Sequence, residues 1–268
     1  MPGAYTTSWC PFPPWTRELQ FDEKWEFVYK KQRHCDDSDP LDRRCGDQWD
    51  HVALDPEHRL VIQVICGKRT AKQVRELVEA AYRRTGQRLP RLITTDEYRP
   101  YKQAILEAWG KPLPRERPYR PGRPRRTKYR PPDGLVYATV HKTRRKGRVV
   151  KVEARLVYGT EEDLAAALAA SPVSKAVNTS FIERQNGTDR HRNSRKVRKT
   201  YRFSKDLSLH EAATYFTMYS SNFCWPVRTL REELPAGHYR ERTPAMVARL
   251  SDHVWTLEEW LRYPVRPS

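Results

Sequence analysis

The sequence predicts an α/β protein in which helices flank a mixed β-sheet. Two observations lead to this prediction. Between residues 19 and 67, large apolar residues alternate with polar residues in short runs, as they do in β-strands. Between residues 71 and 109, two segments with helical spacing of apolar residues enclose one more short apolar strand. Because a strand that follows a helical connection returns parallel to its neighbour, the sheet is expected to be mixed.

The amino-terminal part divides into a lead-in and three strands. Residues 1–18 are rich in proline, which favours an extended lead-in over a folded domain. Three strands are expected next, at residues 19–30, 49–55 and 59–67. The last two are connected by the turn-like sequence DPEH, so they are expected to form a hairpin.

A helix, a strand and a second helix are expected after this hairpin. Thr70 has the side chain of a good N-cap for a helix at residues 71–84. The short apolar strand RLITT then ends directly before Asp96, and residues 98–109 form the second helix. This order of elements predicts that residues 19–110 form the first part of an RNase H-like fold.

The next segment interrupts the pattern with prolines and arginines. Residues 111–132 favour a polyproline II conformation, either as a solvated linker or as a strap that contacts phosphates. Its strongest candidates for such contacts are Arg123, Arg125 and Arg126. A hairpin is expected at 135–159 and a short helix at 161–170. Residues 111–172 are therefore interpreted as an insertion before the last catalytic helix, and residues 173–268 as that helix followed by C-terminal helices.

The charge of the chain indicates a polyanionic partner. There are 51 Lys and Arg against 33 Asp and Glu, which gives a formal net charge of +18. No apolar run approaches the roughly 20 residues of a transmembrane helix, so nucleic acid is favoured over a membrane. The five cysteines are scattered and include no C-x-x-C pair, which indicates neither a disulfide framework nor a zinc ribbon and fits a reducing cytoplasm.

Three acids occupy positions from which carboxylates could converge on divalent metal ions. Asp22 lies inside the first strand, and Asp96 lies at the carboxyl end of the fourth. If these strands are parallel neighbours, both acids reach the same edge of the sheet. Glu183 begins a helix after the insertion. Glu23 is an alternative to Asp22, Asp96 could also cap the following helix, and Glu183 could be an ordinary first-turn glutamate.

Basic residues follow Glu183 closely and are candidates for contacts with nucleic acid. Arg190 lies seven residues after Glu183 on the same helix face, where it could meet a phosphate. The other candidates are Arg192, Arg195, Lys196, Arg198 and Lys199. A solvated helix face is the alternative interpretation of this basic run.

The segments FDEKWEFV, ITTDEYRPY and NTSFIERQNGTDRHRNSRK resemble the three acidic blocks of DDE-type insertion-sequence transposases, and are most similar to the insertion-sequence-one family. The resemblance extends from about Leu19 to Leu250 and lapses over residues 111–172. It implies that Asp22, Asp96 and Glu183 form a metal-binding catalytic triad. The implied cofactor is Mg²⁺ or Mn²⁺, with two ions bound, and no other cofactor is required.

The resemblance also implies a reaction and a set of partners. The expected function is metal-dependent DNA cleavage and strand transfer at the ends of a mobile element, with element ends and target DNA as substrates. Two ends must be processed together, so a homo-oligomer is expected, in the cytoplasm at the bacterial nucleoid. Members of the family use an amino-terminal zinc finger and helix-turn-helix to find these ends, so a DNA-binding partner encoded upstream is a further expectation. The alternatives are a nuclease of the same fold without strand transfer, and an inactive DNA-binding derivative.

Overall fold

The central element of the fold is a six-stranded mixed sheet in the order β3-β2-β1-β4-β7-β8. The computed structural model of the chain describes residues 15–36, 38–114 and 127–263. Parallel pairing joins β1 to β4 and β4 to β7, and the other neighbours are antiparallel. The six strands are β1 (Glu18–Val28), β2 (Gly46–Asp55), β3 (Leu60–Gly67), β4 (Leu92–Asp96), β7 (Tyr137–Arg145) and β8 (Arg148–Tyr158). The predicted α/β class with a mixed sheet is confirmed, and the arrangement is compatible with an RNase H-like fold.

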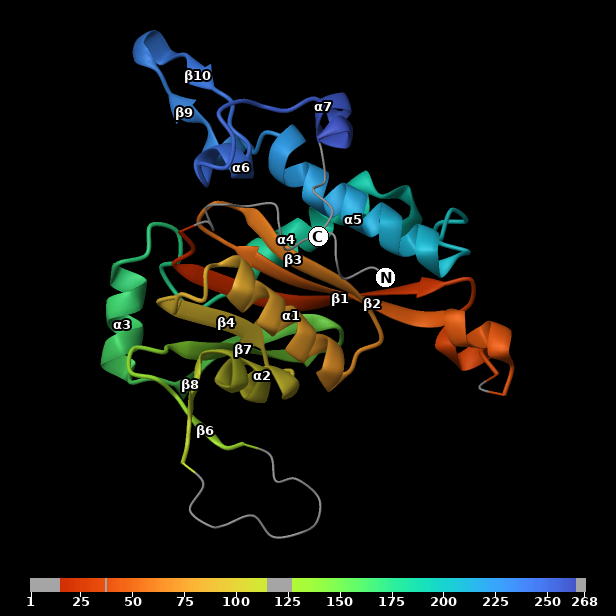
Figure 1. The fold of residues 1–268 in the computed structure, drawn as a ribbon, viewed down its shortest axis with the longest axis horizontal. Helices are drawn as coiled ribbons and strands as arrows, with labels where there is room; N and C mark the ends of the chain where they lie inside the picture. Colours follow the sequence, from red (N-terminus) through yellow and green to blue (C-terminus); the bar gives the residue numbers. More distant parts are fainter. Residues whose placement is uncertain (1–14, 37, 115–126, 264–268) are drawn as a thin grey trace.

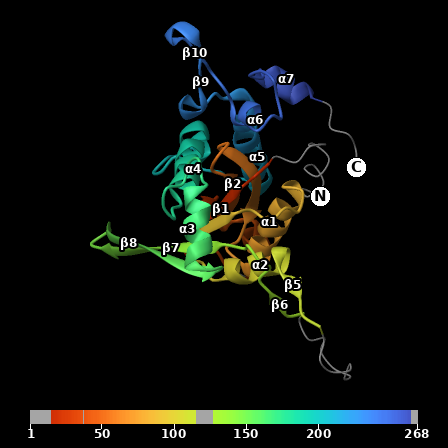
Figure 2. The ribbon, with the colours of Figure 1, turned by 90° about the vertical axis from the view of Figure 1, so that its left-hand side faces the viewer.

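Helices cover both faces of this sheet (Figures 1 and 2). One side of the sheet packs against α1 (Ala71–Arg84) and α2 (Pro100–Trp109), and Figure 2 shows α3 (Glu161–Ala169) and α4 (Ser180–Arg192) on the other side. Helix α5 (Leu207–Cys224) contacts β3 on the face that α4 covers. The sheet is thus the middle layer of three.

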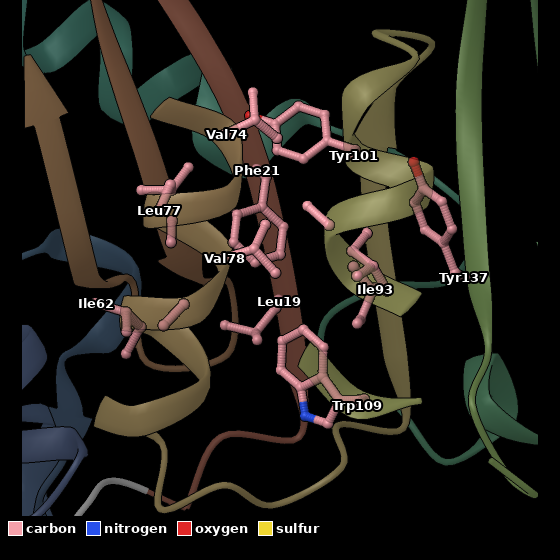
Figure 3. Packing of buried hydrophobic residues seen from close by; sticks show 14 of the residues in the cluster. Leu19, Phe21, Ile62, Val74, Leu77, Val78, Ile93, Tyr101, Trp109 and Tyr137 are labelled. Atoms are coloured by element: carbon pink, nitrogen blue, oxygen red, sulfur yellow. The ribbon is translucent and has the colours of Figure 1, made fainter. Parts of the chain in front are cut away.

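The main hydrophobic core lies between the sheet and helices α1 and α2 (Figure 3). Leu19 and Phe21 of β1 are fully buried in it, against Leu77 of α1 and Ile105 of α2. The predicted cap of α1 is confirmed, since the Thr70 side chain accepts a hydrogen bond from the backbone N–H of Gln73. Burial of large aliphatic and aromatic side chains stabilises a fold by about 1.5 to 3 kcal/mol each, so this core is the main source of stability.

The prediction that residues 111–172 form an insertion is wrong for the hairpin. Strand β7 lies beside β4 in the main sheet, with Thr95 paired to Thr139 and Asp96 to Val140. Helix α3 packs through Leu164 against Leu92 of β4. The first half of β7 is buried, whereas its second half is basic and most of β8 is exposed, so the sequence resembles a surface hairpin. The short helix expected at 161–170 is present as α3, and it begins with a full capping box of Thr160 and Asp163.

Short elements complete the described structure. Strands β5 (Lys111–Pro112) and β6 (Tyr129–Arg130) form a small ladder at the two ends of the Pro/Arg-rich segment. After α5 the chain forms a second small ladder and two short helices, which lie beyond α5 at the top of Figure 1. These are β9 (Glu232–Glu233), β10 (Tyr239–Arg240), α6 (Pro244–Val247) and α7 (Leu257–Arg262). Within the described residues, no helix has the length and apolar character needed to cross a membrane.

Candidate active site

One face of β1 contacts helix α4 through a regular series of side chains. Three pairs form it: Gln20 with Ile182, Asp22 with Asn186, and Lys24 with Asp189. Alternate residues of a strand point to the same face, and residues three or four apart share a face of a helix. Two residues along a strand and three or four residues along a helix both advance by about 5 to 7 Å. The side chains of β1 and α4 therefore stay in register over three pairs. This register fixes α4 against the strand that contains Asp22.

The structure places Asp22 and Asp96 at the same level of the sheet. Phe21 is paired in parallel with Thr95, so the next residue of each strand is one of the two acids. Asp96 is the last residue of β4, whereas β1 continues to Val28. The carboxyl end of β4 therefore leaves open space beside Asp22, which is where binding sites form in sheets with parallel strands.

The electrostatics of Asp22 indicate that the three predicted acids share one region, called here the acid cluster (Asp22, Asp96 and Glu183). Burial raises the pKa of Asp22 to about 6, and the negative charges of Asp96 and Glu183 contribute to the rise. The side chain of Asn186 opposes it by donating a 2.8 Å hydrogen bond to Asp22 Oδ2. The oxygen of the same Asn186 carboxamide, Oδ1, is buried and has no hydrogen-bond partner.

Glu183 lies in the first turn of α4 and is held by two neighbours. Its Oε1 accepts a hydrogen bond of 2.6 Å from the Thr179 hydroxyl and forms an ion pair with Lys142 of β7. The side chains of Glu183 and Asp96 are 46% and 42% exposed, so both carboxylates are accessible. Lys142 falls in the predicted insertion, but it belongs to β7 of the main sheet. Its ammonium group therefore lies at the edge of the acid cluster.

Glu23, the alternative to Asp22, lies on the opposite face of β1. Its side chain is fully buried and forms an ion pair of 3.0 Å with Arg69. Burial raises the pKa of Glu23 to about 7, and the negative charge of Asp96 adds to this rise. Arg69 also lies 3.8 Å from Asp96 and stacks over the rings of Trp49 and Tyr98. Glu23 is thus paired with Arg69 and points away from Asn186 and α4.

A second group of charged residues, called here the ion network, lies one step further along β1 and α4. It consists of Lys24, Asp50, Asp189 and Lys196. All four side chains are at most 1% exposed. Lys196 Nζ lies 2.6 Å from Asp50 and 3.2 Å from Asp189. The expectation that Lys196 contacts nucleic acid is therefore wrong, because its ammonium group is buried between two carboxylates.

Charges within the ion network stabilise each other. Burial acts to raise the pKa of Asp50, but the ammonium groups of Lys196 and Lys24 hold it well below its ordinary value. The same two lysines lower the pKa of Asp189 against the effect of burial. Two cations thus face two anions, and the group requires no external ion for neutrality.

Asp50 also belongs to a compact set of metal-ligating side chains. One ligand atom each from Asp50, Cys66 and His210 lies within 4.8 Å of the others, a spacing at which the three could hold a metal ion. Nε2 of His210 is buried without a hydrogen-bond partner, 3.7 Å from Asp50 Oδ1. Burial raises the pKa of the Cys66 thiol well above its ordinary value, which disfavours the thiolate that a metal requires. Because the lysines of the ion network already neutralise Asp50, we assign this set a structural role.

The other predicted nucleic-acid contacts occupy different positions. Arg190 lies along β1, 3.4 Å from Glu26 and 3.5 Å from the Trp25 carbonyl, rather than at the acid cluster. Arg192 stacks over the ring of Trp225 at 4.7 Å. Arg195 is partly exposed, and Arg198 and Lys199 are exposed. The candidates in the strap, Arg123, Arg125 and Arg126, lie outside the described residues.

Sequence reasoning missed two neighbours of the acid cluster, Asn186 and Lys142. Asn186 follows Glu183 by three residues, a spacing that places both on one side of a helix, so the helical period contained a signal for it. Lys142 gave no such signal, because its position depends on the pairing of β7 with β4.

Comparison with known proteins identifies no family for this chain. No protein-family model matches it, and no curated protein matches it. Among solved structures, a match is found with the Mos1 transposase paired-end complex with left transposon end, at 20% sequence identity and a TM-score of 0.22. The match covers 34% of this chain and 33% of that chain. The chain therefore spans about a third of that protein, and a similarity this low says nothing about fold or activity.

Proposed function

We propose that this chain cleaves DNA strands with divalent metal ions and joins the ends to target DNA, as the catalytic part of a transposase. The observation that supports the proposal most directly is the acid cluster. Burial raises the pKa of Asp22 on β1 to about 6, and the carboxylates of Asp96 on β4 and Glu183 on α4 lie near enough to add to this rise. The resemblance of the three acidic segments to insertion-sequence transposases supports the same function, and the net charge of +18 suits a DNA substrate.

The residues of the acid cluster fit divalent metal ions such as Mg²⁺ or Mn²⁺. These ions prefer carboxylate and amide oxygens, and the cluster offers both types. The repulsion that Asp96 and Glu183 exert on Asp22 would be relieved by a bound cation. The buried Oδ1 of Asn186, which has no hydrogen-bond partner, supplies one more oxygen beside Asp22. Asp22, Asp96 and Glu183 would hold the ions in this proposal.

Bound ions would supply Lewis acidity toward the oxygens that attack and leave the phosphorus atom. The protein contributes orientation and charge. Asn186 fixes the carboxylate of Asp22 through its 2.8 Å hydrogen bond, and Thr179 fixes that of Glu183. Lys142 and Arg69 place positive charges at the border of the cluster, where the phosphate oxygens of a DNA strand would gain from them.

The test is a cleavage and joining assay on supercoiled and linear DNA with the flanking genomic ends, in Mg²⁺ or Mn²⁺. We expect nicked and joined products from the wild-type protein and neither product from Asp96→Asn, which keeps the shape of the side chain but removes its charge. Asp252→Asn, a change of the same type at an exposed aspartate outside the site, is the matched control and is expected to behave as wild type.

The products also separate this proposal from its two alternatives. Nicks without joined products would indicate a nuclease of the same fold that lacks strand transfer. Metal-independent DNA binding without any cleavage, even with the upstream reading frame supplied, would contradict the enzymatic proposal and leave a DNA-binding derivative. Equal activity of wild type and Asp96→Asn would exclude the acid cluster as the site.

A further inference from the structure

Beside α4 lies a hollow of about 910 Å³, whose wall is lined by arginines and whose position differs from that of the acid cluster. We call it the arginine pocket. The arginines that line it are Arg59, Arg184, Arg192, Arg228 and Arg231. Among the described residues that line the pocket, Glu233 is the only acid, so its wall has a formal charge of +4. Its volume is at the upper end of the range for ligand sites, about 300 to 1,000 Å³.

Helix α4 connects this pocket to the acid cluster. Phe181, Arg184, Thr188 and Arg192 recur at intervals of three or four residues, so they lie along one face of the helix. Glu183 and Asn186 lie on a different face. The opposite wall comes from residues 226–244, which precede and include the β9–β10 ladder and lie next to α4 in Figure 2. A ligand in the pocket would therefore be held by the same helix that contains the third acid.

Aromatic rings hold three of the five arginines in place. Arg59 lies over the ring of Phe181 at 3.9 Å, Arg231 over Tyr239 at 3.8 Å, and Arg192 over Trp225 at 4.7 Å. Stacking leaves the edges of a guanidinium group, with their N–H donors, free to meet an anion. These side chains lose less entropy on binding than free arginines would.

Among the described residues, the five arginines of the pocket have no acidic partner. Within the described residues, none of the five has a guanidinium nitrogen within 4.0 Å of a carboxylate, whereas Arg17, Arg69 and Arg75 do. Burial lowers the pKa of Arg59, and the positive charge of neighbouring Arg184 lowers it further. Burial also lowers the pKa of Arg192. Like charges are thus crowded in a partly desolvated wall, and a bound anion would relieve this repulsion.

We propose that the arginine pocket binds the phosphodiester backbone of an unpaired DNA strand. The pocket is concave and bounded by α4 on one side and by residues 226–244 on the other, a shape that suits a single strand better than a duplex. Guanidinium groups bind phosphates in a bidentate manner, so the five arginines of the pocket suit the phosphates of a strand backbone. The inference rests on the proposed function in one respect, since it specifies where the strand beside the acid cluster is held.

The test measures binding of a fluorescent single-stranded DNA oligonucleotide by anisotropy, in Mg²⁺-free buffer, over a series of salt concentrations. The pocket variant is Arg184→Gln with Arg228→Gln, two exposed arginines whose loss leaves the core intact. Arg83→Gln with Arg262→Gln is the matched control, because it removes the same charge from two exposed arginines outside the pocket. Thermal unfolding of each variant verifies that it is folded.

We expect the pocket variant to bind the single strand about 10- to 30-fold more weakly near 0.1 M salt, with a salt slope that is less steep by about 1.4 because two phosphate contacts are lost. The control is expected to keep the wild-type slope. Equal affinity and equal slope in both variants would overturn the proposal. An equal loss for a duplex of the same length would overturn the assignment to an unpaired strand.

The same variants distinguish failure of this inference from failure of the proposed function. If the pocket variant binds as wild type does while the wild type still cleaves DNA, only the pocket assignment is wrong. If no form of the protein cleaves DNA but the pocket variant loses binding, the pocket assignment stands and the catalytic proposal is wrong.

Discussion

The acid cluster and the ion network lie on the same strand and helix, one step apart, yet their charges are arranged in opposite ways. In the ion network, two lysines and two aspartates are at most 1% exposed and neutralise one another. In the acid cluster, Asp96 and Glu183 are 42% and 46% exposed, and their charges add to the rise of the Asp22 pKa that burial causes. The difference teaches that a carboxylate's position is not enough to assign it a role, because the cations that accompany it decide whether it needs an external partner.

The largest expected effect is on the ion network, and it is an effect on stability. Replacing Lys196 by Met leaves Asp50 and Asp189 buried with Lys24 alone, and breaking a buried ion pair in this way destabilises a protein by about 3 to 5 kcal/mol. Denaturant unfolding measures the loss. Lys199→Met, at an exposed lysine three residues further on, is expected to cost less than about 0.5 kcal/mol. Similar free energies of unfolding for the two variants would contradict the view that Lys196 of the ion network matters more for stability than an exposed lysine.

The acid cluster is expected to show the reverse behaviour, with a large effect on activity and a small one on stability. Glu183→Gln should reduce metal-dependent cleavage by more than about 100-fold, since even an outer partner of a metal ligand contributes up to about that factor. Its free energy of unfolding should change by less than about 1 kcal/mol, because an exposed ion pair such as that with Lys142 contributes little. Glu161→Gln changes the first turn of α3 in the same way and serves as control. A loss of several kcal/mol in Glu183→Gln would make Glu183 a structural residue.

The third effect is a dependence of stability on pH that differs between Glu23, on the opposite face of β1, and the ion network. The folded protein holds a proton on Glu23 up to a pKa of about 7, whereas the unfolded chain releases it near 4.5. The contribution of Glu23 to stability is therefore fully present below pH 4.5 and is lost as the pH rises through 7, by about 3 kcal/mol. Glu23→Gln should flatten this part of the profile in urea unfolding.

The aspartates of the ion network titrate in the opposite direction. Their pKa values lie below 3.8, so their contribution is present above that pH and is lost as the pH falls further. The loss of stability at low pH should therefore persist in the Glu23→Gln variant. An unchanged slope between pH 4.5 and 7 in this variant would assign that part of the profile to other groups.

Sequence patterns were sufficient for the elements whose stability depends on local periodicity. Strands β1 to β4, helices α1 and α2 and the cap at Thr70 follow from alternation, helical spacing and capping chemistry. The pairing of β7 with β4 could not be predicted in the same way, because only the first four residues of β7, Tyr137–Val140, are buried and most of β8 is exposed. Long-range pairing leaves little trace in a sequence when half of a strand lies outside the core.

For the candidate site, the sequence could specify which acids to consider but not which cations stand beside them. Lys196 and Arg198 belong to the same basic run, yet the first is buried and the second exposed. The buried partner of Lys196 is Asp50, 146 residues away in the chain. No local pattern encodes such a contact. The arginine pocket was missed for the same reason, since its two walls come from α4 and from residues 226–244.

The three contact pairs between β1 and α4 limit how the helix can move. Contacts of Gln20, Asp22 and Lys24 with the helix span three successive pairs, so α4 cannot slide along the strand without breaking all of them. Regions joined in this way open together, and their amide protons exchange with solvent only when the whole unit unfolds. The backbone that holds Glu183 should therefore exchange as slowly as the central strand, although the Glu183 side chain faces water. Any movement that accommodates a substrate would then come from the arginine side chains and the C-terminal ladder rather than from the helix itself.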